Sequence, residues 1–186
     1  GLKVVAISDY NTTIYKKDGI DVDAALKFAE GHGRTILGYK EAGCKTITPE
    51  EFWGLDVDVL FPAAMENQIN EKNVDSIKAR IILEGANGPT TVDADKVLCK
   101  KNIAVLPDVL TNAGGVVVSY FEWVQNLESF MWEEDEVDHH LNKIMTKAFD
   151  EVWDIHEEFK VPFRMAAYML ALRRIIKAKE LRNIFP

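Results

Sequence analysis

The sequence contains few cysteines and no long hydrophobic run, and both absences restrict what the protein can be. Its two cysteines, Cys44 and Cys99, are too few for a disulfide framework and lack CxxC spacing. They suit a reducing compartment, so we expect a cytoplasmic location. No run of about 18 consecutive apolar residues occurs, and therefore no membrane-spanning helix is expected.

An excess of positive charge is also absent. Lys and Arg number 22 against 30 Asp and Glu, which gives a formal net charge of −8. Because an acidic chain repels phosphate backbones, we expect no nucleic-acid partner. Apolar residues make up 47% and charged residues 28% of the 186 residues, which is typical of a soluble globular chain and excludes a disordered one.

The beginning of the sequence is unusual. Its first residue is Gly1 rather than Met, and the apolar residues 4–7 follow almost at once. A natural N-terminus seldom lies so close to a buried strand, so we expect these residues to be a piece of a longer polypeptide.

Short apolar segments alternate with helical patterns in the first half of the chain. Four segments read as buried strands, at residues 3–7, 57–61, 80–83 and 103–106. Helical patterns lie between them, at residues 22–29, from Thr48, and at residues 91–99. This alternation predicts an α/β fold with a mostly parallel, doubly wound sheet. Ligands of such sheets bind at the carboxyl ends of the strands.

The second half of the chain is predicted to be helical. Two apolar stripes recur at helical spacing, one over residues 137–155 and one over residues 165–176. Pro162 lies between them and is expected to separate two helices.

Three polar residues are candidates for ligand contacts. Asp9 ends the first predicted strand, where a carboxylate can accept hydrogen bonds from a ribose and would repel a 2′-phosphate; a turn-forming Asp is an equally good interpretation. Asn112 and the two glycines after it open a predicted helix, a pattern that also occurs in ordinary turns. Ser119 would share the face of Asn112, although helical serines commonly bond their own backbone. The four histidines lack HExxH spacing, so no metal site is expected.

Several strings in the chain resemble the glutamate dehydrogenase family, which has leucine, phenylalanine and valine dehydrogenases as relatives. They are ISD at residues 7–9, IY at 14–15, DGI at 18–20, FPAAMEN at 61–67, EGANGPTT at 84–91, LPD at 106–108 and NAGGVVVSYFEW at 112–123. The unbroken SYFEWVQN string and the long helical tail are more similar to the glutamate enzymes than to their relatives.

The resemblance implies a Rossmann-like domain and a role for individual residues. It implies that five residues at one edge of the predicted sheet contact the cofactor: Asp9, Ala63, Ala64, Asn87 and Asn112. It also implies that Val116 lines the pocket for the substrate side chain and that Ser119 binds the distal carboxylate of glutamate. The implied reaction is the reversible oxidative deamination of L-glutamate to 2-oxoglutarate and ammonia. Asp9 favours NAD over NADP as the cofactor.

The resemblance further implies that parts of the family's enzyme lie outside these residues. These parts are an N-terminal domain with the catalytic lysine and aspartate, the first strand of the sheet, and the glycine-rich turn that holds the pyrophosphate. We therefore expect residues 1–130 to form a partial dinucleotide-binding domain and residues 131–186 a helical segment that packs toward the N-terminal domain. The 186 residues alone are expected to be inactive, and the full chain is expected to form a homohexamer.

Two alternatives remain open at this point. One is a non-catalytic module that retains a degenerate dinucleotide fold. The other is a dehydrogenase for leucine, phenylalanine or valine, which Ser119 disfavours because an apolar side chain offers no partner for a hydroxyl.

Overall fold

The computed structural model describes residues 1–182, and the last four residues of the expected helical segment 131–186 lie outside this part. The described chain forms two compact units. One comprises residues 1–56 and 73–78, and the other comprises residues 57–72 and the chain from residue 79 onward. The boundary expected from the sequence, between residues 130 and 131, separates the dinucleotide-binding part from the helical segment rather than these two units, and it stays a prediction.

The first unit is built on a small antiparallel sheet. Its elements are β1 (Ala6–Ser8), β2 (Thr13–Tyr15), α1 (Val22–Glu30), β3 (Lys45–Thr46), α2 (Pro49–Trp53) and the 3-10 turn η1 (Val74–Ser76). The strands follow one another in the order β1-β2-β3. The unit has its own core, formed by Ile14, Ile20, Ala25 and Ile36.

The pairing of β1 differs from the expected one. We predicted a strand over residues 3–7 within the parallel sheet, whereas β1 pairs antiparallel with β2, Ile7 opposite Ile14. The reason is local: residues 13–15 are β-branched or aromatic, and a four-residue turn returns the chain directly onto β1. Only the string IY marked this second strand in the sequence.

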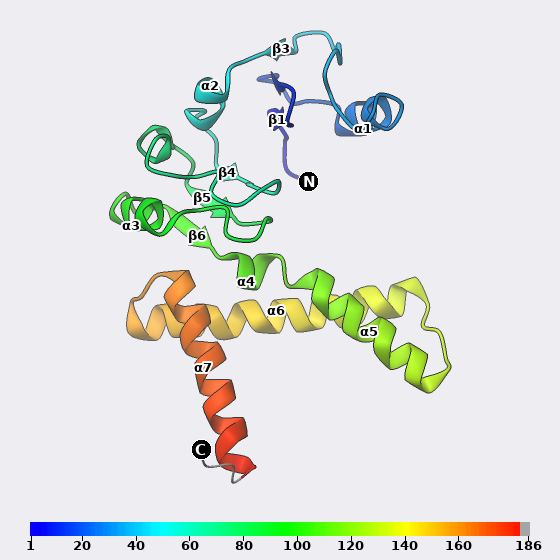
Figure 1. Ribbon diagram of the computed structural model, residues 1–186, viewed down its shortest axis with the longest axis vertical. Helices are drawn as coiled ribbons and strands as arrows, with labels where there is room; N and C mark the ends of the chain where they lie inside the picture. Colours follow the sequence, from blue (N-terminus) through cyan, green and yellow to red (C-terminus); the bar gives the residue numbers. More distant parts are fainter. Residues whose placement is uncertain (183–186) are drawn as a thin grey trace. The chain divides into compact units, whose positions relative to one another are not determined.

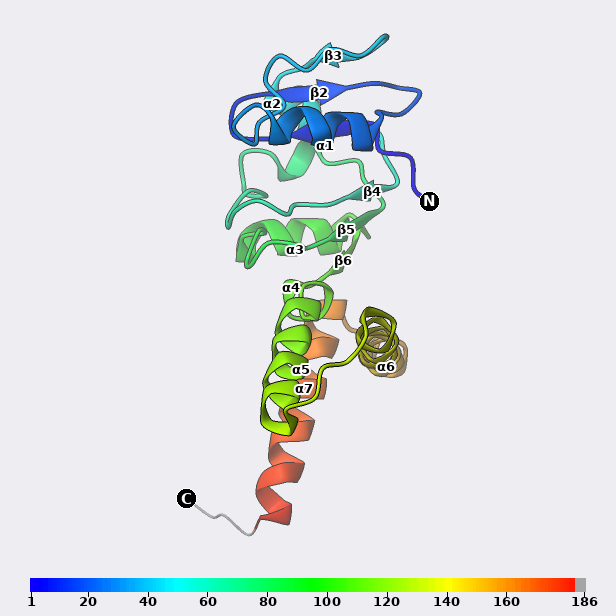
Figure 2. The same ribbon diagram turned by 90° about the vertical axis from the view of Figure 1, so that its right-hand side faces the viewer.

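The second unit contains the expected parallel sheet and the helices. Its elements are β4 (Val59–Leu60), β5 (Ile81–Leu83), α3 (Val92–Lys100), β6 (Ala104–Leu106), α4 (Asp108–Thr111), α5 (Gly114–Glu128), α6 (Glu134–Phe159) and α7 (Phe163–Leu181). The strands pair in parallel in the order β4-β5-β6. Figure 2 shows α3 beside this sheet, as expected of a helix that connects two parallel strands.

Three helices begin close to positions that the sequence indicated: Thr48, residue 91 and the residues after Pro162. Thr48 caps α2 in a capping box with Glu51, and Thr91 caps α3 by accepting a hydrogen bond from the amide of Ala94. Pro162 precedes α7 and ends the continuity with α6. These polar caps satisfy backbone amides that have no partner inside the helix; the cap at Thr48 was predicted from the sequence, whereas for α3 only the helix itself was.

The long helices α5 and α7 both pack on α6 (Figure 1). A hydrophobic core joins α4, α6 and α7, and it is formed by Leu110, Val152, Ile155, Phe163, Ala166 and Ala167. On α7 the small residues at 166 and 167 face this core, and most of the predicted apolar stripe of α7 is exposed. Within the described residues, no helix has the length and hydrophobicity needed to cross a membrane.

Candidate functional site

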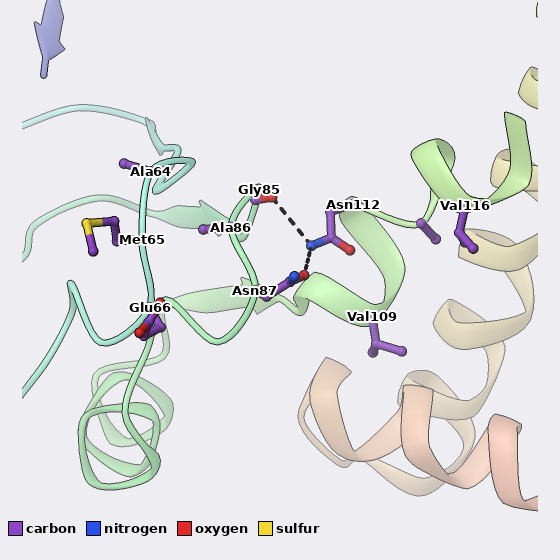
Figure 3. Close-up of a pocket in the computed structure, with 10 residues that line it drawn as sticks. Ala64, Met65, Glu66, Gly85, Ala86, Asn87, Val109, Asn112 and Val116 are labelled. Atoms are coloured by element: carbon purple, nitrogen blue, oxygen red, sulfur yellow. Dashed lines mark hydrogen bonds between the residues drawn. The ribbon is translucent and has the colours of Figure 1, made fainter. Parts of the chain in front are cut away.

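A pocket of about 720 Å³ lies at the carboxyl ends of the parallel strands in the second unit. Ligand pockets of proteins commonly have about this volume. Its lining comes from three loops and helix starts: Ala64, Met65 and Glu66 after β4; Gly85, Ala86 and Asn87 after β5; and Val109, Asn112, Ala113 and Val116 after β6. Figure 3 shows these residues around the pocket. This is the edge of the sheet at which the sequence predicted a ligand.

Two asparagine side chains meet inside this pocket. The Asn112 side-chain amide donates a hydrogen bond of 2.7 Å to Oδ1 of Asn87 and a longer one of 3.4 Å to the carbonyl oxygen of Gly85 (Figure 3). The pair therefore links the loop after β5 to the end of α4. The other polar atoms of these amides are available to a ligand that carries both donors and acceptors, such as a carboxamide or a ribose.

The position of Asn112 differs from the expected one. It lies at the C-terminal end of α4, and the long helix α5 begins two residues later at Gly114. Pro107, with its preset φ, starts a helical turn directly after β6, which the sequence interpretation overlooked. The seven-residue spacing therefore no longer fixes Asn112 and Ser119 on one helix face.

The loops after β4 and β5 approach each other closely at Gly85. A Cβ at this position would lie 3.1 Å from the Cβ of Ala63 and 2.7 Å from the ring of Phe61. Only glycine fits such a contact without a shift of the neighbours. Ala63 is thus a neighbour of the pocket, whereas Ala64 belongs to its lining.

The two candidate substrate residues lie on α5. Val116 lines the pocket and is largely exposed. Ser119 is exposed too and does not belong to the lining. Within residues 1–182 its hydroxyl makes no hydrogen bond, so the common back-bond of a helical serine to its own helix is not formed.

Asp9 lies in the first unit, in the turn between β1 and β2. Its Oδ1 accepts hydrogen bonds from the amides of Asn11 and Thr12, both at 2.8 Å. Its Oδ2 accepts hydrogen bonds from the Thr35 hydroxyl at 2.6 Å and from the Ile36 amide at 2.7 Å. The carboxylate thus performs the turn role that was one of its two sequence interpretations, and its ribose role stays a prediction.

These contacts also set the protonation of Asp9. Partial burial by itself raises the pKa of the Asp9 carboxyl, but the hydrogen bonds from Thr35 and from the three amides together bring that pKa below its ordinary value. The side chain is therefore ionised at neutral pH.

The sequence interpretation overlooked a charged pair in the second unit, directly after β5. Glu84 is completely buried directly after β5, and Arg164 of α7 donates to it a hydrogen bond of 2.7 Å. Two features of the sequence could have revealed this pair: a charged residue at the end of an apolar strand, and one Arg in the first turn of α7, well before the charged residues of its C-terminal half. Among the described residues, no group of three His, Cys, Asp or Glu side chains is placed to hold a metal ion.

A parallel α/β sheet with a pocket at its strand ends defines the class as an α/β domain of the nucleotide-binding type. Comparison with protein families narrows this class, because the model of the Glutamate/Leucine/Phenylalanine/Valine dehydrogenase family matches residues 1–183. The chain belongs to this family.

Individual relatives agree with the family. The chain is 47% identical over 186 residues to the glutamate dehydrogenase of Thermotoga maritima, covering 100% of this chain and 44% of the relative. It is 45% identical to the NAD-specific glutamate dehydrogenase of Clostridioides difficile and 47% identical to the NADP-specific glutamate dehydrogenase of a Synechocystis species, in each case over 98% of this chain and 44% of the relative. The chain thus spans less than half the length of these relatives.

A solved structure shows the same fold. The hetero-hexameric glutamate dehydrogenase from Thermus thermophilus, crystallised with leucine bound, superposes with a TM-score of 0.88 at 32% identity. The match covers 100% of this chain and 43% of that chain. The predicted fold class is confirmed by this similarity.

Proposed function

We propose that this chain is the cofactor-domain part of a glutamate dehydrogenase, which catalyses the reversible oxidative deamination of L-glutamate to 2-oxoglutarate and ammonia. The main support is the pocket in which Asn87 and Asn112 meet at the carboxyl ends of the strands. The whole reaction requires residues outside this chain, so the 186 residues alone are expected to be inactive.

The lining of the pocket fits a nicotinamide dinucleotide. The pocket lining has no side chain at Gly85 and only a methyl group at Ala64, with Ala63 beside it, so the cofactor would lie against the strand ends. The amides of Asn87 and Asn112 would orient its polar groups. The bound cofactor supplies a nicotinamide ring that accepts the hydride from the substrate.

Val116 and Ser119 would contact the substrate on α5. Val116 would provide an apolar wall, and the unbonded hydroxyl of Ser119 would donate a hydrogen bond to the distal carboxylate of glutamate. In the full-length enzyme, Ser119→Ala should lower kcat/KM for glutamate by about 100-fold and for norvaline by less than about threefold. Norvaline lacks the carboxylate and is therefore the matched substrate. Equal losses for both substrates would refute the role of Ser119.

We further propose that the enzyme prefers NAD over NADP. The ionised Asp9 would accept hydrogen bonds from the ribose and repel a 2′-phosphate, and the relatives include both NAD-specific and NADP-specific enzymes. Asp9→Asn should reduce the NAD-to-NADP ratio of kcat/KM at least about tenfold. Thr35→Val is the matched control, because it removes one hydrogen bond to Asp9 but leaves the charge. An unchanged ratio in Asp9→Asn would show that Asp9 does not select the cofactor.

The outer face of α7 supports the expected packing of residues 131–186 toward an N-terminal domain. Four large apolar side chains on this face are at least half exposed, at Met165, Tyr168, Leu172 and Ile175. Soluble proteins cover apolar patches of this kind with other parts of the same or a neighbouring chain. Homohexamer formation by the full chain is proposed from the family alone.

A further inference from the structure

Arg164 is enclosed by three carboxylates at the start of α7. Its guanidinium donates a hydrogen bond of 2.7 Å to Glu84 and two, of 3.2 and 3.3 Å, to Oδ1 of Asp95. A third acid, Asp108, lies 3.8 Å from the same guanidinium. The Arg164 side chain is only 20% exposed. A single cation therefore joins α7 to α3, to the end of β5 and to the start of α4.

The partners of Arg164 hold the main chain on both sides of the pocket. The second carboxylate oxygen of Glu84 accepts a hydrogen bond of 3.0 Å from the amide of Asp108. The Asp108 carboxylate in turn accepts a hydrogen bond of 2.8 Å from the amide of Gly88. Gly88 follows Asn87 directly, and Asp108 begins the helical turn that ends at Asn112. Neither Arg164 nor its three partners line the pocket.

The charges explain why a cation is needed at this point. Glu84 is completely buried, so water cannot solvate its carboxylate. Burial alone lowers the pKa of the Arg164 guanidinium, but the hydrogen bond and the charge of Glu84, together with Asp95, raise that pKa above its ordinary value. Without Arg164, three acids would repel one another across the segments that carry Asn87 and Asn112.

We infer that Arg164 is a positioning residue: through Glu84 and Asp108 it sets the separation of Asn87 and Asn112 and thereby the affinity of the pocket for the dinucleotide. The inference rests on the proposed cofactor role of this pocket. It makes α7 a part of the binding machinery although no residue of α7 lines the pocket. We expect the catalytic step itself to be unaffected, because Arg164 does not line the pocket.

The test uses the full-length enzyme with Arg164→Gln, Arg164→Lys and, as a matched control, Arg174→Gln. Arg174 lies on the same helix and pairs with Glu151 at the surface. Arg164→Gln should raise the Kd for NADH, measured by its fluorescence, and the KM for NAD by about tenfold. The value of kcat and the KM for the amino acid should change less than about twofold. Arg164→Lys keeps the charge but not the fork of donors, so its effect should be about threefold.

The outcomes separate the inference from the function on which it rests. Equal NADH affinity of the parent and both Arg164 variants would overturn the inference, even if the variants melt at lower temperature, because that result marks a purely structural role. A fall in kcat with no change in KM for NAD would overturn it too. If the parent enzyme binds neither NADH nor NADPH, the proposed function fails and the inference falls with it. If Arg164→Gln does not fold, Arg164→Lys provides the same test, with an expected effect of about threefold.

Discussion

Two carboxylates in this chain, Asp9 and Glu84, follow a strand directly and are held in different ways. Asp9 is partly exposed, and its four hydrogen-bond donors are uncharged and lie within 27 residues of it. Glu84 is completely buried, and its principal partner is the guanidinium of Arg164, 80 residues further along the chain. One acid organises its own loop, and the other joins distant segments.

The difference follows from solvation. Near the surface, amide dipoles, one hydroxyl and water are enough to stabilise the charge of Asp9, and they also lower its pKa. In the interior, water is excluded, and an opposite charge such as that of Arg164 offsets the cost of burying a carboxylate. Glu84 is therefore paired with a cation from a distant helix, whereas Asp9 is held by hydrogen bonds from nearby loops.

Removal of the cation beside Glu84 should have the largest effect on stability. Arg164→Met leaves three acids together, one of them fully buried, and should lower the free energy of unfolding by about 3–5 kcal/mol. Urea unfolding of the full-length protein measures it. The matched control, Arg174→Met, removes a surface ion pair and should cost less than about 1 kcal/mol. Similar losses of unfolding free energy in the two variants would show that the buried pair contributes no more to stability than the surface pair.

A change next to Glu84 that leaves every charge in place separates packing from electrostatics. Gly85→Ala adds a Cβ that meets Ala63 and Phe61, and it should lower the free energy of unfolding by about 1–3 kcal/mol. Gly88→Asn is the control in the same loop, since open space surrounds Gly88 and Asn tolerates its φ of 54°. Thermal unfolding compares the two. Close packing at Gly85 would be disproved by an unchanged melting temperature in Gly85→Ala.

Acid should break the Asp9 contacts by protonation. Because the folded pKa of Asp9 is lowered, its contribution to stability is present above the unfolded pKa, about 3.9, and is lost as the pH falls through the folded value. Asp9→Asn should cost about 2 kcal/mol at pH 7 and weaken the loss of stability between about pH 4 and pH 2. Asp18→Asn, at an exposed position of the same unit, should leave this pH dependence as it is. Urea unfolding as a function of pH checks both variants, and an unaltered profile in Asp9→Asn would contradict the hydrogen bonds assigned to Asp9.

Much of the fold could be predicted because it depends on local signals. The cap Thr48, the helix from residue 91, the break at Pro162 and the three parallel strands all follow from neighbouring residues. The pairing of β1 with β2 was missed because a three-residue strand carries little pattern of its own. The place of Asn112 was also missed, since the single turn of α4 is shorter than any helical period that a sequence can display.

The sequence by itself determined the family resemblance, the three apolar strands of the parallel sheet and the polar residues that follow these strands. Each of these features depends on residues that lie close together in the chain. Only the tertiary structure decided which groups meet. The amide pair of Asn87 and Asn112 and the charged cluster around Arg164 join residues 25 and 80 positions apart. No spacing in the sequence predicts these contacts. They form because the folded chain brings these residues together, and because a buried charge such as Glu84 is stabilised by an opposite charge where water is excluded.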